Sequence, residues 1–257
     1  MIQPLYIRIL LLRSLFFTAL VFGFAWPCLA QDSARHVLTI YLENTGGRAL
    51  WAETEGLHTA GVYFESNGGF HNTEVSGLPV EFVFVQYSDG RSIMTSRPIE
   101  QHAVESRQCI AAGELSMLQL QAGDTLAHYT RPYETEEAKR VYGRFCPQRY
   151  LLDSAALPEI HYEGIERAGD TRYWVLSIAE GKKITHWSID IETGFLRMMG
   201  DLSTGDYVLL SEYREVNGRM LPFKEETFRK RQLIHAKIIQ EASFIPGDLS
   251  CDTVFFR

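Results

Sequence analysis

Alternating hydrophobic and polar positions are clearest in the last fifty residues of the chain. Three segments share this period-two pattern, which is typical of strands with one buried face: residues 207–215, 220–228 and 233–244. Asn217 and Gly218 lie between the first two segments, and this pair tolerates positive φ at both centres of a type I′ hairpin turn. The pattern therefore predicts a three-stranded antiparallel meander with one apolar and one polar face.

A second strongly β-like run covers residues 80–87, which are rich in valine and aromatic side chains. Phe82, Phe84 and Gln86 share one face of this run, because side chains alternate along a strand. Asp89-Gly90 follows directly and is a typical hairpin turn. We therefore expect a second antiparallel hairpin in the first half of the chain.

The remaining segments are less regular. Strand-like runs between residues 160 and 191, separated by turn residues about every ten positions, extend the meander. Residues 98–114 show no clear pattern, and residues 115–127 fit a helix or a strand. Three short segments have the apolar spacing or the charge distribution of helices: residues 35–43, 48–55 and 134–145.

The first thirty residues follow a different pattern. Two arginines accompany a long apolar run without any acidic residue, and small residues ending at Ala30 offer a cleavage site. This predicts a secretory signal peptide, residues 1–30, followed by one domain, residues 31–257, in the periplasm. The alternatives are a retained membrane anchor and a lipoprotein acylated at Cys28.

The charge balance excludes one class of partner. The whole chain has a net charge of −7, and removal of the two arginines in the first thirty residues leaves 23 basic against 32 acidic residues, or −9. Nucleic-acid binding requires clustered Lys and Arg, so we expect no nucleic-acid partner. Membrane contact is expected to be peripheral at most.

Three cysteines remain after cleavage, namely Cys109, Cys146 and Cys251. An exported protein meets an oxidising compartment, so we expect a disulfide, and the odd count leaves one thiol over. Cys109–Cys146 is the preferred pair. By reducing the conformational entropy of the unfolded chain, this disulfide would stabilise the fold by about 3–4 kcal/mol.

No pattern of catalytic residues stands out. The sequence has neither a Gly-x-Ser-x-Gly elbow nor a His-Glu-x-x-His motif, and we expect no metal and no cofactor. His161 and Glu163 would share a strand face and could act as an acid–base pair, but the polar alternation of a solvated strand is the preferred explanation. Asp190 and Glu192 lie near a turn, where carboxylates commonly accept backbone hydrogen bonds.

Several short motifs together resemble one family. Residues 41–51, Tyr-Leu-Glu-Asn-Thr-Gly-Gly-Arg-Ala-Leu-Trp, resemble the amphipathic helix and Gly-Gly break that precede the first strand of exported LolA-like proteins. Residues 190–196, Asp-Ile-Glu-Thr-Gly-Phe-Leu, and 217–222, Asn-Gly-Arg-Met-Leu-Pro, are similar to a turn and a hairpin of the same family. Residues 244–246, Phe-Ile-Pro, are similar to its last strand. The order and spacing of these motifs carry the resemblance.

The resemblance implies a mainly β (α+β) fold, a curved antiparallel half-barrel with a few short helices covering its concave face. In such proteins the concavity takes acyl chains or other apolar ligands, so we expect a non-catalytic protein that binds a lipid, an acyl chain or another hydrophobic ligand. The alternatives are an envelope protein-interaction module that grips a partner helix or peptide, and an enzyme on the same scaffold. The ligand contacts are expected on the apolar strand faces, at Phe82, Phe84, Leu209, Tyr213, Ile234 and Ile238.

Overall fold

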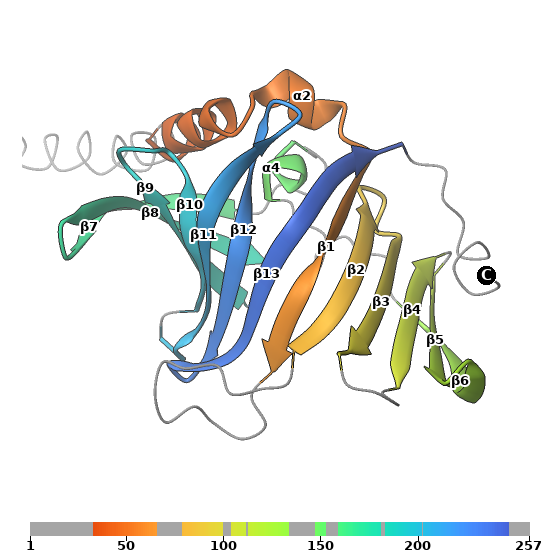
Figure 1. Cartoon of the computed structure of the whole chain (residues 1–257). Helices are drawn as coiled ribbons and strands as arrows, with labels where there is room; N and C mark the ends of the chain where they lie inside the picture. The colour runs from red at the N-terminus through yellow and green to blue at the C-terminus, as the bar shows by residue number, and fades with distance from the viewer. Residues whose placement is uncertain are drawn as a thin grey trace, which may run out of the picture.

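Most of the described chain forms one strongly curved antiparallel sheet of 13 strands that does not close into a barrel (Figure 1). A computed structural model describes residues 33–65, 79–99, 104–111, 113–133, 147–152, 159–180, 183–201 and 203–246. The strands are β1 (Gly56–Glu65), β2 (Pro79–Tyr87), β3 (Ser92–Pro98), β4 (Glu105–Ala111), β5 (Glu114–Gln121), β6 (Asp124–Pro132), β7 (Glu159–Ala168), β8 (Thr171–Glu180), β9 (Lys183–Asp190), β10 (Leu196–Asp201), β11 (Asp206–Val216), β12 (Arg219–Arg229) and β13 (Gln232–Ile245). The expected half-barrel is confirmed.

The sheet is a meander with one long-range pairing. Its spatial order runs β6-β5-β4-β3-β2-β1-β13-β12-β11-β10-β9-β8-β7, so β1 and β13 are the neighbours that are distant in sequence. They pair antiparallel from Gly56 opposite Ile245 to Glu65 opposite His235. We call this pairing the seam. The two edge strands are β6 and β7, and the seam lies between the two halves of the sheet (Figure 1).

Short helices cover one end of the concave side of the sheet (Figure 1). They are a first helix over residues 33–44, α2 (Arg48–Ala52) and α4 (Pro147–Tyr150). The first helix buries Val37 and Tyr41, one turn apart, as its apolar stripe requires. It ends where Gly46 and Gly47 take positive φ of 128° and 86°, values that residues with a Cβ rarely adopt. The first two predicted helices are confirmed, and the third, residues 134–145, lies outside the described residues.

Two apolar clusters join these helices to the sheet. One cluster, called here the helix cluster, packs the first helix and Leu151, which follows α4, against strands β8 to β11. Its members are Ala34, Val37, Tyr41, Leu151, Leu176, Ile178, Trp187, Ile189, Leu196, Met199 and Leu210. The seam cluster lies below α2, around the seam: Leu42, Trp51, Leu57, Phe82, Leu221, Phe223 and Ile239. Both contain helix residues, so both lie on the face of the sheet that carries the helices, here called the inner face.

The β11–β12 hairpin turns as the sequence predicts and supports the end of the first helix. Asn217 and Gly218 have φ of 49° and 78°, both positive. The chain at Gly46 passes so close to this hairpin that a Cβ there would lie 2.7 Å from the carbonyl oxygen of Gly218. The backbone N–H of Met220 also donates to the carbonyl oxygen of Thr45 at 3.0 Å. Glycine at position 46 therefore allows the helix to dock on the sheet.

The region that the sequence left without a pattern is regular in the structure. Residues 105–132 contribute the three strands β4, β5 and β6, and the segment 115–127 is strand rather than helix. Ala122 and Gly123, with φ of 52° and 91°, turn the chain between β5 and β6. Many side chains of β5 and β6 stay partly or fully exposed. These strands therefore lack the strong apolar alternation that reveals a buried strand in a sequence.

Candidate ligand site

A pocket opens on the inner face at the seam, between β1, β2, β12 and β13. It is lined by five apolar side chains and four polar ones: Leu57, Phe84, Leu221, Pro222, Ile239, Thr59, Gln86, Glu225 and Lys237. Leu57, Leu221 and Ile239 also belong to the seam cluster, beside Trp51 of α2. With a volume of about 20 Å³, the pocket has room for about one water molecule. A longer apolar ligand can enter only when the lining side chains move apart.

An ion pair occupies the polar side of this pocket. Lys237 Nζ lies 3.5 Å from Glu225 Oε2, and both side chains are largely buried. The two residues are opposite each other on β13 and β12. The Lys237 ammonium also lies 5.0 Å from the ring centre of Phe82 and 5.9 Å from that of Phe84, within the range of cation–π attraction. These contacts offset part of the cost of removing two charges from water.

Gln86 is the second polar feature of the pocket. Its side chain is only 2% exposed, and its Oε1 atom has no hydrogen-bond partner among the described residues. Its backbone is fixed, because Gln86 pairs with Leu57 on β1 and with Ser92 on β3. Thr59, the fourth polar residue, donates its hydroxyl to the carbonyl oxygen of Phe84 at 3.5 Å. An unpaired buried acceptor is costly, so Gln86 is a candidate ligand contact.

Arg219, which is buried at the start of β12, links α2 to the sheet above the seam cluster. Its Nη2 donates to the carbonyl oxygen of Leu50 at 2.6 Å, just before the end of α2. Its guanidinium carbon lies 4.3 Å from the ring centre of Phe244 and 5.8 Å from that of Trp51. Trp51 Nε1 in turn donates to the carbonyl oxygen of Thr45 at 3.0 Å. This hydrogen bonding holds α2 above the seam.

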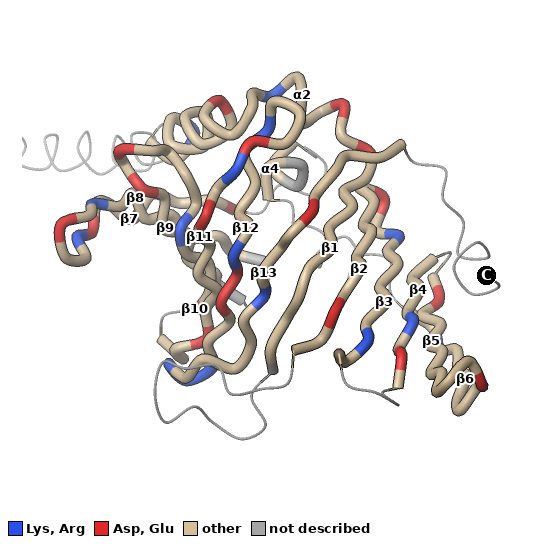
Figure 2. Tube along the Cα trace, viewed as in Figure 1, with Lys and Arg blue, Asp and Glu red and all other residues tan. Residues whose placement is uncertain are grey.

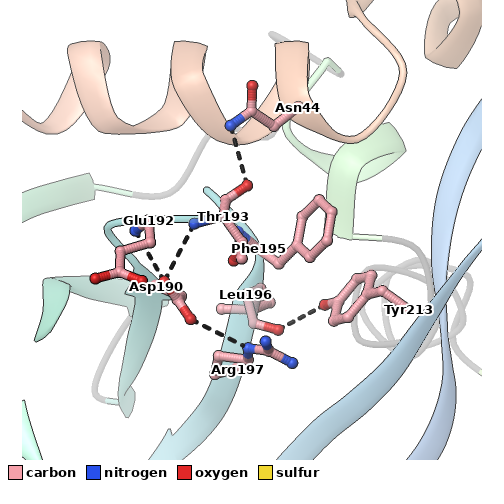
Figure 3. Close-up of polar contacts among 8 residues, drawn as sticks. All are labelled: Asn44, Asp190, Glu192, Thr193, Phe195, Leu196, Arg197 and Tyr213. Atoms are coloured by element: carbon pink, nitrogen blue, oxygen red, sulfur yellow. Dashed lines mark hydrogen bonds and ion pairs between the residues drawn. The ribbon is translucent and has the colours of Figure 1, made fainter. Parts of the chain in front are cut away.

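The first helix is fastened to the sheet at the turn between β9 and β10 (Figure 3). The Nδ2 group of Asn44 donates to the carbonyl oxygen of Thr193 at 3.0 Å. The Asp190 carboxylate accepts the backbone N–H groups of Glu192 and Thr193 at 2.9 and 3.2 Å. At Gly194 a Cβ would collide with the Asn44 side chain. The prediction that Asp190 is a backbone acceptor is confirmed.

A half-buried tyrosine, Tyr213, continues this contact region on β11. The Tyr213 hydroxyl donates to the carbonyl oxygen of Leu196 at 2.5 Å, and its ring stacks on Phe195 with 4.5 Å between centres (Figure 3). Burial raises the pKa of the Tyr213 hydroxyl above its ordinary value. Arg197 Nε lies 3.5 Å from Asp190 Oδ2, and the guanidinium carbon of Arg197 lies 5.8 Å from the Tyr213 ring centre. Because these polar groups are paired with one another, the region is a structural support for the helix.

Three of the six expected ligand residues lie on the inner face. Phe84 lines the pocket, and Phe82 lies beneath the Lys237 ammonium in the seam cluster. Tyr213 packs against the helix cluster, away from the pocket lining. Leu209 falls between Val208 and Leu210, which pack in that cluster, so its side chain points to the other face of the sheet. The structure thus brings only Phe82 and Phe84 together at the pocket.

The last strand shows why Ile234 and Ile238 do not join them. Lys237 and Ile239 line the pocket, so Ile238, between them, points to the outer face, where it is 38% exposed. Strict alternation along residues 233–244 would place Ile238 on the same face as Ala242. A β-bulge separates them, because Gly61 pairs with Ile239 and Ala60 with Glu241. The expected inward direction of Ile238 is therefore corrected; Ile234, half-buried, also lies outside the pocket lining.

Two pocket residues were visible in the sequence but were not interpreted as site residues. Gln86 shares its strand face with Phe82 and Phe84, an unusual place for an amide. Lys237 interrupts the apolar last strand, and a buried lysine requires a partner. Its partner Glu225 is identified only by the register of β12 against β13. Polar residues inside an apolar pattern were the signal for this site.

The described residues contain no cluster placed to hold a metal ion, and the acid–base pair considered from the sequence does not form. Among them no group of three His, Cys, Asp or Glu side chains is placed to hold a metal ion. His161 pairs with Glu159 at 3.1 Å, whereas Glu163 accepts the Ser177 hydroxyl, so His161 and Glu163 form no pair. The pocket combines apolar contact with an amide and an ion pair.

The charge distribution also restricts the partners. Basic and acidic side chains of the described residues are interspersed along the strands. Strand β1 has no Lys, Arg, Asp or Glu from Gly56 to Phe64 (Figure 2). No helix within the described ranges is both long and apolar enough to span a membrane.

Cys109 is buried on β4, whereas Cys146 and Cys251 lie outside the described residues. The Cys109–Cys146 pairing therefore stays a prediction.

Comparison with solved structures finds the same architecture elsewhere. A DUF1329 family protein from Desulfovibrio piger superposes with a TM-score of 0.53 and 11% identity, over 86% of this chain and 96% of that one. The chain shares this fold. A LolA superfamily protein from Nitrosomonas europaea gives a TM-score of 0.49 at 10% identity, over 87% of this chain and 97% of that one. No family model matches the sequence, and no curated protein matches it. The open half-barrel expected from the sequence is confirmed by the 13-stranded sheet and by the likeness to the DUF1329 family protein.

Proposed function

We propose that this protein is an exported, non-catalytic binding protein that holds a lipid, an acyl chain or another hydrophobic ligand on the inner face of its half-barrel. The observation that carries the proposal is the pocket at the seam, where Leu57, Phe84, Leu221 and Ile239 surround a space on the inner face of the sheet. Apolar pockets with a few placed polar groups are the usual form of small-molecule sites.

The proposed ligand lies at the seam rather than under the first helix. The helix cluster is filled by its own large side chains, with Leu176, Ile189 and Leu196 completely buried. At the seam, Phe82 and Phe84 remain the proposed ligand contacts from the sequence, joined by Leu57, Leu221 and Ile239. A bound chain would extend the seam cluster by separating Phe84 from the side chains of β12.

A chain-length series tests this function. The fluorescence of 1,6-diphenyl-1,3,5-hexatriene, an uncharged apolar probe, reports binding to the purified protein, and 1-octanol, 1-decanol and 1-dodecanol then displace it. Each methylene that becomes buried contributes about 0.8 kcal/mol, or about fourfold in affinity. A rise of that size along the series supports an acyl-chain site. Absence of probe binding, or affinity that does not depend on chain length, would contradict it.

Native mass spectrometry of the purified protein gives an independent test. A lipid that co-purifies supports the hydrophobic-ligand function. A protein that carries no lipid, binds no probe, and yet captures an amphipathic helical peptide would instead support the partner-binding alternative, because a helix can lay its apolar face in the same groove.

The proposed location is the periplasm, with residues 1–30 removed as a signal peptide and residues 31–257 forming the mature domain. The basic, apolar and small-residue order of the first thirty positions supports this. Amino-terminal sequencing of the protein from the cell envelope should begin at Gln31, and a start at Met1 or an acylated Cys28 would contradict it. Peptide mapping without reductant tests the proposed Cys109–Cys146 bridge in the same preparation.

A further inference from the structure

The polar side of the seam pocket carries information about the ligand that its apolar lining does not. Gln86 is 2% exposed and belongs to the pocket lining, and its Oε1 atom has no hydrogen-bond partner among the described residues. Buried polar groups in proteins are almost always hydrogen-bonded. The strand around Gln86 cannot slide to satisfy it, because its backbone is paired on both sides, with Leu57 and Ser92.

The charged groups of the pocket are already engaged with each other. Lys237 and Glu225 form an ion pair at 3.5 Å, and the ammonium also faces the Phe82 ring at 5.0 Å. The pair is electrically neutral as a unit, so the pocket does not offer a net positive charge to an anionic headgroup. A ligand carboxylate would have to leave water without gaining a net positive charge from this pair, and the Gln86 oxygen would repel it.

We propose that the pocket recognises an uncharged amphiphile whose polar end donates a hydrogen bond, such as a hydroxyl or an amide N–H, to Gln86 Oε1. The ligand's apolar chain then lies against Leu57, Leu221 and Ile239. This assignment rests on the proposed function and names the chemical class of its ligand. It distinguishes alcohols, monoacylglycerols and primary or secondary fatty amides from free fatty acids and from esters or ethers without a donor.

Displacement of diphenylhexatriene by three twelve-carbon ligands tests the assignment: 1-dodecanol, its methyl ether 1-methoxydodecane, and laurate. The ether has the same chain and an extra methyl group, so hydrophobic transfer alone favours the ether. We expect the alcohol to displace the probe at about tenfold lower concentration than the ether, the size of one buried hydrogen bond. Laurate should also bind more weakly than the alcohol.

Two glutamine variants assign the effect to one side chain. Gln86→Met keeps the length of the side chain and removes the acceptor, so the preference for alcohol over ether should disappear while probe binding persists. Gln148→Met is the matched control. Gln148 is also 2% exposed with an unpartnered Oε1 among the described residues, but it belongs to α4 and does not line the pocket. This variant should keep the tenfold preference.

The outcomes separate this inference from the proposed function. If the wild-type protein binds no probe, the hydrophobic-ligand function itself is contradicted. If the wild-type protein binds the probe, two outcomes overturn only the assignment of a donor headgroup to Gln86. One is equal displacement of the probe by the alcohol and the ether, and the other is strongest displacement by laurate. The wild-type comparison decides this even if Gln86→Met fails to fold, and an unchanged preference in folded Gln86→Met would overturn the assignment as well.

Discussion

The helix cluster and the seam pocket lie on the same inner face but are built differently. The helix cluster joins the first helix to β8–β11 through apolar side chains such as Trp187 and Leu176, and the polar groups at its rim are paired with one another. The seam pocket, between β1, β2, β12 and β13, retains an ion pair and the unpartnered amide oxygen of Gln86. Gln148 on α4 also has an unpartnered amide oxygen, but of these two glutamines only Gln86 lines the pocket.

The contrast indicates that one curved sheet combines, on its inner face, a region closed by its own side chains and a region with an open pocket. Residues that only stabilise the fold are satisfied within the fold, as Asn44 and Asp190 are at the turn under the first helix. Gln86 is not satisfied in this way and also lines the pocket, and the two observations together are the basis for proposing the site at the seam. The two regions should therefore respond differently to mutation.

The largest effect is expected in the helix cluster. Trp187→Ala removes a large side chain that is 5% exposed, and should lower the free energy of unfolding by about 3–5 kcal/mol. Because Trp187 is not part of the pocket lining, the folded protein should bind diphenylhexatriene with unchanged affinity. Urea unfolding and probe titration at low temperature measure both quantities. Phe84→Ala is the comparison, and equal losses of probe affinity in the two variants would remove the distinction.

A slightly smaller effect is expected at the ion pair. Lys237→Met leaves the Glu225 carboxylate, 14% exposed, without its cation, and should cost about 3 kcal/mol of stability. The double variant Lys237→Met, Glu225→Leu removes both charges and should recover most of that loss. Urea unfolding of the single and double variants measures the coupling. Losses that simply add would show that the pair contributes nothing to the pocket.

A moderate effect is expected where the first helix is fastened to the sheet. Asn44→Ala removes the hydrogen bond to the Thr193 carbonyl oxygen and should cost about 1 kcal/mol. Amide exchange in residues 33–44 should become faster, whereas exchange at the seam should not. The neighbouring exposed residue Glu43 provides the control, because Glu43→Ala should change stability by no more than about 0.5 kcal/mol. Faster exchange at the seam in Asn44→Ala would mean that the two regions are coupled.

The smallest effect is expected on the outer face. Ile238→Asp places a carboxylate at a position that is 38% exposed and opposite Lys224, so the cost should stay within about 1 kcal/mol, the range of strand propensities. Probe affinity should not change. Ile239→Asp, one residue further and buried in the seam cluster, should disrupt folding or binding. A loss of probe binding in Ile238→Asp would show that the ligand contacts the outer face.

The fold was largely predictable because its signals are local. The Asn217-Gly218 turn, the Gly46-Gly47 helix end and the alternation in residues 80–87 each depend on neighbours in sequence, and each is confirmed. Strands β4 to β6 were missed for a physical reason. Their side chains are mostly part-exposed, so the pairing of backbone groups, which the sequence does not display, defines them.

The site was less predictable because it depends on register. Phe82 and Phe84 were singled out from alternation alone; Phe84 lines the pocket, whereas Phe82 lies beside Lys237 in the seam cluster. A single extra residue at the bulge opposite Ala60 and Gly61 changes the face of every position before it on β13, which explains the correction at Ile238. A bulge is specified by the partner strand: at Gly61 a Cβ would collide with the carbonyl oxygen of Ile238.

The seam also affects how the chain reaches this structure. Every other strand pair in the described sheet joins neighbours in sequence, and such hairpins close short loops quickly. The pairing of Gly56 with Ile245 must instead close a loop of nearly the whole domain. Until β13 pairs with it, one edge of β1 has no partner strand, so we expect the seam and its pocket to form late in folding. A chain cut between β6 and β7 would accordingly yield two contiguous meanders that rejoin along the seam.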